Sequence, residues 1–470
     1  MIADIKPYPE YKDSGQEWLG EVPSHWEIRR LRASINDCTN GVWGGDPNGK
    51  DDLFCVRVAD FDRIGLRVSL RKKTVRAIPV SARSTRMLQR GDLLLEKSGG
   101  GELQPVGVVV AYTHDEPAVC SNFVARMSIA EGYNSFFVNY LHATLYAKRI
   151  NVLSIKQTTG IQNLDGKAYL SESVAYPPTA EQATIVRFLD HWNGRLEKAI
   201  RSKRRVIALL QEQKQAIIHR AVTRGLNPTV QLKDSGIPWL GEIPEHWEVR
   251  RNMALFSLRV ESGIEGLPVL QVSLRSGITM EELDQFGRPK KLIADATKYK
   301  RVHQGDMAYN TMRMWQGAVG VSPCDGLVSP AYVVVAPRGD TIPEFYDYVF
   351  HTDLYKQQVN RQSTGIVSDR NRLYWDSFKQ MPNLVLPETE QRDIISFILK
   401  ETGGIDLAIA RFEREITLLR EYRTRLTADV VTGKLDVRAA AAQLPEQAED
   451  EPLPDPEIAD EETELEEVEG

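Results

Sequence analysis

Apolar residues recur at helical spacing over two long stretches of this chain, Pro178–Leu226 and Pro387–Leu435. The second stretch repeats the first without a gap, at a constant offset of 209 residues. This seven-residue periodicity predicts two long helices whose apolar stripes pair as a coiled coil. Amphipathic helices are also common in ordinary globular cores, but a chain that carries one stripe twice can bury one copy against the other.

The predicted seam between the helices is a set of large apolar residues on each stretch. They are Leu196, Ile200, Ile207, Leu210 and Ile217 in the first, and Ile405, Ile409, Phe412, Ile416, Leu419 and Leu426 in the second. Thr179 with Gln182 fits a capping box at the start of the first helix. We expect Gly194 and Gly403 to break the helices, since glycine is a poor helix former.

A second kind of repeat precedes each variable part of the chain. Lys12–Arg30 returns as Lys233–Arg251, with fourteen of nineteen positions identical. The Trp-Leu and His-Trp pairs around Gly and Pro predict a rigid turn wedged against a helix end, and a histidine such as His25 is then structural. For the first copy to complete a repeat unit, Leu435 must end beside Lys12, so we expect antiparallel helices and a pseudo-twofold axis.

Two blocks of mixed pattern lie between these repeats, Leu31–Tyr176 and Asn252–Leu386. Short apolar runs such as Leu93–Leu95 and Tyr332–Val335 stand between Gly, Asp and Ser and predict strands. Longer runs predict a helix in each block, Phe136–Ile150 and Phe345–Val359. The expected fold class is therefore α/β (α+β), with two α/β blocks separated by two long antiparallel coiled-coil helices.

Length and composition restrict the class of protein. A chain of 470 residues predicts two or three domains. No apolar run approaches the length of a membrane span and no secretory signal opens the chain, so we expect a cytoplasmic protein that does not bind membranes. The four cysteines form no CxxC pair, which argues against a zinc site.

The net charge of -6 conceals a basic body. Thirteen of the 65 acidic residues lie from Glu446 onward, which leaves 52 acidic residues against all 59 basic residues. The chain without this acidic segment is therefore positive, which suits a polyanionic partner such as a nucleic acid.

Two features of each block are candidates for DNA contact. Basic runs, Arg63–Arg90 and Arg288–Arg301, each precede a Gly-Asp pair, although such runs are often simply solvated. Thr-Gly loops lie in Lys156–Asn163 and Arg361–Arg370, where Gln, Asn and Arg can reach base edges, although a plain turn would look the same. The candidate residues are Arg71, Lys72, Lys73, Arg76, Lys97, Lys156, Gln157, Thr159, Gly160, Gln162, Asn163, Lys290, Lys291, Lys298, Arg313, Gln362, Thr364, Gly365, Ser368 and Arg370.

Catalytic motifs are not convincing in this sequence. Gly44–Lys50 has the spacing of a phosphate-binding loop, but Asp51 replaces the Ser or Thr that would hold magnesium. Ser329–Tyr332 only approaches the Asn/Asp-Pro-Pro-Tyr group of amino-methyltransferases. We predict a non-catalytic chain that binds no metal and no cofactor of its own.

Each block is preceded by W-L-G-E-(V/I)-P-x-H-W and followed by P-x-x-E-Q-x-x-I. In this the chain resembles, over about residues 11–440, the specificity subunit of type I restriction-modification systems. The resemblance implies that each block is a target recognition domain that reads one half of a split DNA site. It also implies that the helices dock two methyltransferase subunits, which bind S-adenosylmethionine and methylate adenine at N6. Endonuclease/translocase subunits that use ATP and Mg can join the complex, and all chemistry belongs to these partners.

The resemblance also orders the predicted domains. They are an N-terminal segment completing the circular repeat (1–30), recognition domain 1 (31–177), the central helical spacer (178–231), the repeat of the N-terminal segment (232–251), recognition domain 2 (252–386), the distal helical spacer (387–438) and an acidic disordered tail (439–470). Two other interpretations stay open: a self-contained DNA methyltransferase or nuclease, and a coiled-coil scaffold that never touches DNA.

Overall fold

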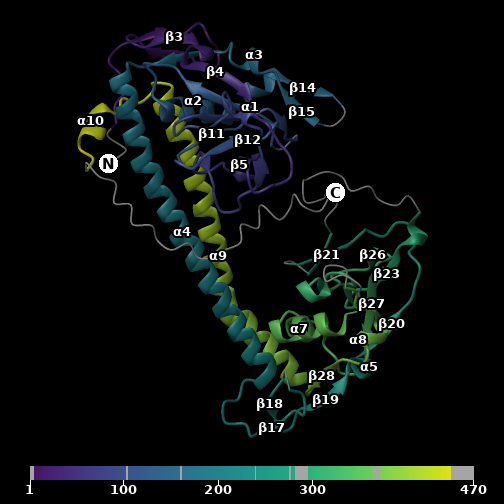
Figure 1. Cartoon of the computed structure of the whole chain (residues 1–470). Helices are drawn as coiled ribbons and strands as arrows, with labels where there is room; N and C mark the ends of the chain where they lie inside the picture. Colours follow the sequence, from purple (N-terminus) through teal and green to yellow (C-terminus); the bar gives the residue numbers. More distant parts are fainter. Residues whose placement is uncertain are drawn as a thin grey trace. The chain divides into compact units, whose positions relative to one another are not determined.

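The computed structural model describes residues 5–101, 104–158, 161–238, 240–274, 277–280, 295–363 and 371–445. The chain divides into two compact units (Figure 1). Unit 1 comprises Met1–Arg201 with Glu415–Gly470, and unit 2 comprises Ser202–Arg414. Both units contain sheets and helices, which confirms the mixed α/β class.

Unit 1 is built mainly of short strands. The strands are β1 (Tyr11–Asp13), β2 (Glu21–Pro23), β3 (Glu27–Arg30), β4 (Ile35–Asn40), β5 (Asp52–Val56), β6 (Phe61–Asp62), β7 (Arg67–Val68), β8 (Val75–Ala77), β9 (Leu93–Glu96), β10 (Ser98–Gly99), β11 (Val109–Ala111), β12 (Ala118–Cys120), β13 (Val124–Ile129), β14 (Ile155–Thr158), β15 (Ile161–Leu164) and β16 (Ser173–Tyr176). The helices of this unit are α1 (Val80–Arg83), α2 (Ser135–Ala147), α3 (Gly166–Tyr169) and α10 (Arg438–Ala442), with 3-10 turns η2 (Leu31–Ser34), η3 (Val58–Asp60) and η4 (Ile150–Ser154).

Unit 2 has the same general composition. The strands are β17 (Leu232–Asp234), β18 (Glu242–Pro244), β19 (Glu248–Arg251), β20 (Phe256–Arg259), β21 (Gln271–Ser273), β22 (Gly277–Thr279), β23 (Lys300–Val302), β24 (Met307–Asn310), β25 (Val319–Val321), β26 (Gly326–Val328), β27 (Tyr332–Pro337) and β28 (Pro382–Val385). The helices are α5 (Asn252–Leu255), α6 (Pro343–Phe350), α7 (Asp353–Gln362) and α8 (Trp375–Phe378), with 3-10 turns η5 (Ala296–Lys298) and η6 (Met314–Gln316).

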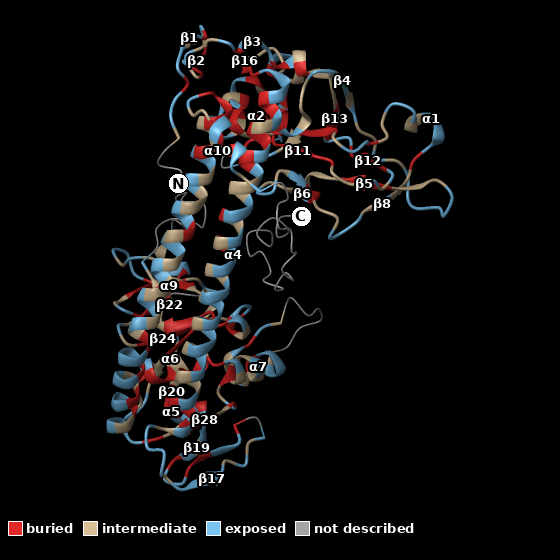
Figure 2. Cartoon of the chain, turned by 90° about the vertical axis from the view of Figure 1, so that its left-hand side faces the viewer, coloured by how far each residue is buried: buried red, intermediate tan, exposed pale blue. Residues whose placement is uncertain are grey.

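The main sheet of unit 1 separates two cores. Its order is β4-β13-β9-β11-β7-β6, and the first four strands are antiparallel. Successive side chains of β9 point to opposite faces, as the pleat requires. Leu93 and Leu95 join the core that contains α2, whereas Leu94 joins a second core with β5 and β12. The central strands are therefore buried on both faces (Figure 2).

Unit 2 repeats this arrangement with fewer strands. Its main sheet has the order β20-β27-β24-β25, all antiparallel. Met307 and Tyr309 of β24 enter the core that contains α6 and α7, while Ala308 enters the core on the other face. The register between the corresponding central strands is also the same. In unit 1 the first residue of β13, Val124, pairs with the last residue of β9, Glu96, and in unit 2 the first residue of β27, Tyr332, pairs with the last residue of β24, Asn310.

Two long helices connect the sheets, α4 (Thr179–Arg224) and α9 (Glu388–Val431). In unit 1 the start of α4 packs in one core with the end of α9, for example Ile185 with Val430. In unit 2 the end of α4 packs with the start of α9, for example Val222 with Ile394. The helices therefore run antiparallel in both units, where they lie side by side (Figure 1).

Every residue predicted for the seam is shielded to some degree. Leu196, Ile200, Ile416 and Leu426 are buried, and the other seven predicted seam residues are half-buried. Polar contacts supplement the apolar stripe, because Lys214 forms an ion pair with Asp406 at 2.6 Å and Arg423 forms one with Glu197 at 3.3 Å.

Two local predictions for these helices are wrong. Both helices continue through Gly194 and Gly403, because packing along the seam outweighs the roughly 1 kcal/mol that an interior glycine costs. The capping box is also absent: the Thr179 hydroxyl donates to the Gly132 carbonyl at 2.7 Å, and Gln182 accepts a hydrogen bond from the Asn134 backbone at 2.8 Å. Tertiary partners have replaced the local cap.

The predicted helices of the two blocks exist with different ends. Phe136–Ile150 corresponds to α2, which ends at Ala147 and is followed by η4. Phe345–Val359 is divided into α6 and α7, because Thr352 begins a new helix by accepting the Tyr355 N–H at 3.3 Å. Of the helices in the described ranges, none is both long and apolar enough to cross a membrane.

Candidate nucleic-acid interface

In both units a glutamate at the start of a long helix holds the repeated His-Trp pair. We call this set of contacts the joint. In unit 1 the Glu181 carboxylate contacts His25 Nε2 at 2.8 Å and accepts from Trp26 Nε1 at 3.1 Å and from the Tyr8 hydroxyl at 2.7 Å. In unit 2 Glu390 contacts His246 Nε2 at 2.8 Å and accepts from Trp247 Nε1 at 3.0 Å. The two repeated motifs thus meet at the start of each long helix.

The adjacent glutamine holds the variable block to the same helix start. Gln182 accepts the Asn134 N–H directly before α2, and Gln391 accepts the Ile342 N–H directly before α6, at 2.9 Å. The side-chain amides donate to carbonyls of the preceding segment, Pro177 in unit 1 and Leu386 in unit 2. Each Glu-Gln pair therefore fixes one block against one helix.

The N-terminal segment supplies this joint to unit 1. Tyr11 donates from its hydroxyl to the Gly433 carbonyl at 3.1 Å, and Asp436 N–H donates to the Lys6 carbonyl at 2.9 Å. In unit 2 Gly225, directly after α4, lies against Trp247, as Gly433 lies against Trp26 in unit 1. The end of α9 is thus followed in space by the start of the chain, as the sequence repeat requires.

A three-stranded sheet in unit 1 gathers several of the predicted DNA-contacting residues. Its order is β10-β15-β14, with Ser98 opposite Asn163 and Lys156 also opposite Asn163. The candidate Lys97, directly before β10, and the Thr-Gly segment Lys156–Asn163 therefore lie together. Thr159 and Gly160, which stand between β14 and β15 in the sequence, lie outside the described residues.

The polar side chains of this sheet have defined partners. Lys97 donates from Nζ to Asn40 Oδ1 at 2.6 Å, and Ser98 donates from its hydroxyl to Asn163. Lys156 forms an ion pair with Asp165 at 2.7 Å, which holds the pKa of Asp165 below its usual range, while the Lys156 side chain stays 74% exposed. Gln157 is exposed beside it. Lys156 and Gln157 can therefore reach a polyanion without unfolding the sheet.

Gln162 differs from its neighbours in the same sheet. Its side chain is only 7% exposed and its Oε1 accepts the Val106 N–H at 3.2 Å. Gln162 therefore positions the strand instead of facing solvent, and we drop it from the proposed DNA contacts. Gln157 lies directly opposite Gln162, so both side chains are on the same face of the sheet, but Gln157 is on the edge strand β14 and Gln162 is on the central strand β15 beside Val106. Nothing in the sequence shows which of the two strands is central.

The basic run of unit 1 lies largely on its surface, but its residues differ. Arg71, Lys72 and Lys73 are exposed, and Lys73 forms an ion pair with Glu116 at 2.7 Å. Arg76 has a fixed place: it stacks on Trp43 at 4.7 Å and pairs with Asp46 at 2.7 Å. Arg76 therefore supports the loop that carries Trp43.

Each Gly-Asp pair beside the basic runs has a structural role. Asp92 accepts the Gln89 N–H at 2.7 Å and pairs with Arg126 at 2.6 Å. Asp306 accepts the His303 N–H at 2.9 Å and pairs with Arg259 at 2.6 Å. Both carboxylates are buried, so each closes a turn and neutralises one arginine before the central strand begins.

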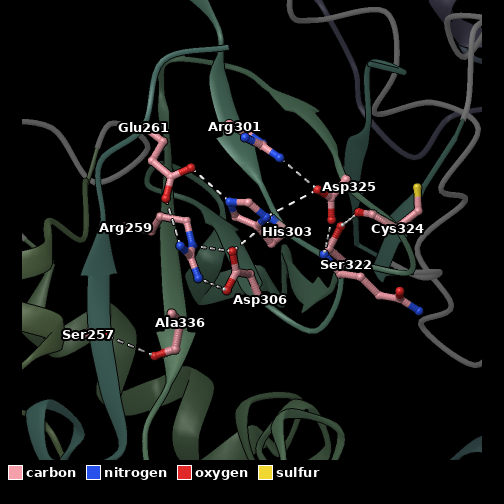
Figure 3. Close-up of polar contacts among 11 residues, drawn as sticks. Ser257, Arg259, Glu261, Arg301, His303, Asp306, Ser322, Cys324, Asp325 and Ala336 are labelled. Atoms are coloured by element: carbon pink, nitrogen blue, oxygen red, sulfur yellow. Dashed lines mark hydrogen bonds and ion pairs between the residues drawn. The ribbon is translucent and has the colours of Figure 1, made fainter. Parts of the chain in front are cut away.

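A charged network extends from the Asp306 pair in unit 2 (Figure 3). His303 lies between Glu261 and Asp325, with Nε2 2.9 Å from Glu261 and Nδ1 3.3 Å from Asp325. The hydrogen bond from His303, followed by that from Arg259, lowers the pKa of Glu261. No group of three or more His, Cys, Asp or Glu within the described ranges could hold a metal ion. The network therefore ties β20, β23 and β26 together electrostatically.

The candidate residues of unit 2 are less concentrated. Arg313 is exposed before η6, which packs against α7, and Gln362 is exposed at the end of α7. Lys298 is exposed in η5. The candidates Lys290, Lys291, Thr364, Gly365, Ser368 and Arg370 lie outside the described residues.

Comparisons with known proteins agree with the resemblance seen in the sequence. The chain is 21% identical over 461 residues to the putative type I restriction enzyme MjaX specificity subunit of Methanocaldococcus jannaschii, covering 93% of this chain and 100% of that protein. It is 30% identical over 110 residues to the type I restriction enzyme MjaVIII specificity subunit of the same organism, covering 23% of this chain and 24% of that protein. No family model matches the chain.

A solved structure supports the fold. It comes from work on complex assembly and conformational transition of a type I restriction-modification system. The match has a TM-score of 0.60 and 15% identity, and covers 88% of this chain and 99% of the other. The predicted resemblance to specificity subunits is therefore confirmed.

Proposed function

We propose that this chain, a relative of type I restriction enzyme specificity subunits over nearly its whole length, is the DNA sequence-specificity subunit of such a complex. It is a recognition subunit and performs no catalysis itself. The sheet blocks 31–177 and 252–386 serve as target recognition domains, and each reads one half of an asymmetric bipartite site in double-stranded DNA. S-adenosylmethionine, ATP and Mg are used by partner subunits.

The observation that carries this proposal is the contrast between a framework that the two units share and exposed side chains that differ between them. The joint at Glu181 or Glu390 and the register of the main sheet are the same in both units. Exposed side chains at matched positions differ, with Phe123 directly before β13 where Ala331 stands directly before β27. A duplicated framework with unlike surfaces suits a protein that reads two unlike half-sites.

We propose that α4 and α9 set the spacing of the two half-sites and dock two methyltransferase subunits. Exposed apolar residues off the seam, such as Leu209 at 57% and Leu407 at 75%, are available for subunit contacts. Readers about one helical turn of DNA apart, each covering about four base pairs, leave a gap on the order of six base pairs. Endonuclease/translocase subunits would join through the methyltransferases.

The decisive experiment compares adenine methylation across the genome in cells with and without this gene. We expect one split, asymmetric motif to be methylated only when the gene is present. Replacing residues 31–177 by the corresponding block of another relative should change one half of that motif and leave the other half intact. A change in both halves, or no gene-dependent motif, would refute the assignment.

Binding by the purified full chain gives an independent test. If six or more phosphates are neutralised, affinity for duplex DNA should fall about a thousandfold or more between 50 and 200 mM salt. A coiled-coil scaffold would show no such affinity. A self-contained methyltransferase would instead bind S-adenosylmethionine without partner subunits, which calorimetry on the same preparation detects.

A further inference from the structure

A tight turn in unit 1 presents an aromatic ring at the edge of the candidate interface. The turn Ser121–Phe123 joins β12 to β13, and Phe123 is 50% exposed. The Val124 N–H donates to the Ser121 carbonyl at 3.0 Å. The Phe123 carbonyl accepts from the N–H groups of Lys97 and Ser98, at 2.8 and 3.3 Å. The backbone that carries the ring is therefore fixed from both sides.

Close packing also restricts this turn. Gly41 lies so near the carbonyls of Cys120 and Ser121 that a Cβ at position 41 would overlap them. The Gly41 N–H donates to the Val124 carbonyl at 2.9 Å. A half-exposed ring on a backbone held this firmly loses little conformational entropy when it makes a contact.

The surroundings of Phe123 are polar. Lys97 and Asn40 are hydrogen-bonded to each other, and Ser98 and Asn163 form a second pair in the adjoining strands. A single exposed apolar residue is ordinary on a protein surface. This one, however, is anchored to the backbone of the same segment, Lys97–Ser98, that pairs with the candidate sheet.

Unit 2 contains the same turn without the ring. Ser329–Ala331 joins β26 to β27, and the Tyr332 N–H donates to the Ser329 carbonyl at 2.9 Å. The residue at the position of Phe123 is Ala331, whose carbonyl accepts from the Thr311 hydroxyl at 3.1 Å. The backbone is thus reproduced in both units, while the exposed aromatic occurs in unit 1.

We propose that Phe123 contacts the C5-methyl group of a thymine in the half-site that unit 1 reads. This inference rests on the proposed function and adds a specificity-determining residue to it. The thymine methyl is the apolar group that base pairs display in the major groove, and phenylalanine is among the side chains that contact it. Hydrogen-bonding side chains beside the ring would read the neighbouring base edges.

The test uses the full chain and duplex DNA selected from a random library. Wild-type protein should select a split motif with at least one T·A pair at a fixed place in one half. For Phe123→Ala, discrimination at that pair should fall about tenfold, as for loss of one base contact. The other half of the motif should be unchanged. Phe123→Leu should retain most of the discrimination, because it keeps an apolar contact.

Uracil substitution isolates the methyl group without altering the protein. Replacing the identified thymine by uracil should weaken wild-type binding about tenfold and have no effect on Phe123→Ala. Phe136→Ala, which removes another surface ring of unit 1 that is 37% exposed, is the matched control and should select the wild-type motif.

The outcomes separate the two proposals. If wild-type protein selects no motif, the proposed function fails. If it selects a split motif that Phe123→Ala leaves intact, or if uracil binds as well as thymine at every position, the function stands and the role of Phe123 is refuted. A change confined to positions without thymine would refute it as well.

Discussion

The two units solve one structural problem with residues from different strands. Each must neutralise the buried aspartate of its Gly-Asp turn. Unit 1 uses Arg126 of β13, whereas unit 2 uses Arg259 of β20. In unit 1 Arg126 lies directly opposite Thr39, and in unit 2 Arg259 lies directly opposite Val334. The arginine thus occupies either member of one cross-strand pair.

This difference shows which features the duplicated framework requires. The joints at Glu181 and Glu390 keep the same residues, because a carboxylate that receives both an indole N–H and an imidazole admits few substitutes. Inside the sheets only an ion pair with the buried aspartate is required, and the arginine that forms it lies on a different strand in each unit. The blocks can therefore change their surfaces while the joints stay constant.

The largest expected effect comes from removing a joint tryptophan. Trp26 and Trp247 are both fully buried. Trp26→Ala should lower the stability of unit 1 by about 3–5 kcal/mol through loss of buried area and a residual cavity, and Trp247→Ala should do the same to unit 2. Native-state hydrogen exchange, followed separately in the two units, measures the loss.

A surface tryptophan provides the control for this comparison. Trp43→Ala removes a ring that is 39% exposed, and its effect on hydrogen exchange in the main sheet should be small. Equal loss of protection in both units after Trp26→Ala alone would contradict the view that each joint serves its own unit.

A smaller effect is expected from breaking the charge pairs of the sheets. Arg126→Ala leaves Asp92 buried without its cation, and Arg259→Ala does the same to Asp306, so each should cost about 3 kcal/mol. The double change Arg126→Val with Thr39→Arg copies the arrangement of unit 2. It should recover most of the stability in a urea unfolding experiment.

The double variant tests whether stability requires only an aspartate–arginine ion pair or requires the arginine at position 126. Thr39→Arg alone places a second cation beside an aspartate that is already neutralised, and should not stabilise unit 1. If the double variant were no more stable than Arg126→Ala, the two units would not share an interchangeable pair.

The smallest effect concerns acid sensitivity and distinguishes a buried histidine of unit 1 from a partly exposed histidine of unit 2. His142 of α2 is fully buried, and burial lowers its pKa from 6.5 to about 3. Its unfolded form binds a proton as pH falls below 6.5 while the folded form stays neutral. This histidine therefore does not lower the free energy of unfolding above pH 6.5. The free energy of unfolding falls as pH drops toward 3, by about 2 kcal/mol between pH 6.5 and 5.

His351 directly follows α6 in unit 2, and its side chain is 27% exposed and hydrogen-bonded to the Asp347 carbonyl. His142→Gln should flatten the acid dependence of unit 1 in urea unfolding at pH 5 and 6.5. His351→Gln is the control and should not change it. An unaltered acid slope in His142→Gln would assign the sensitivity to other groups.

Features with a strong local pattern were predictable from the sequence. The seam residues, the antiparallel direction and the strand at Leu93–Leu95 follow from periodicity and from the repeat. Features that depend on distant partners were not. The burial of Gln162 depends on Val106, and the lost capping box at Thr179 depends on Gly132 and Asn134.

The sequence alone determined the duplication, the two long helices and the family that the chain resembles, because repeats and heptads are properties of residue order. Tertiary structure decided which polar residues hold the framework and which remain exposed. Lys156 and Gln162 are both polar residues of the same Thr-Gly segment, yet the Lys156 side chain reaches solvent and the Gln162 side chain is buried. The reason is physical: strand register and charge pairing are set by contacts between residues far apart in the chain.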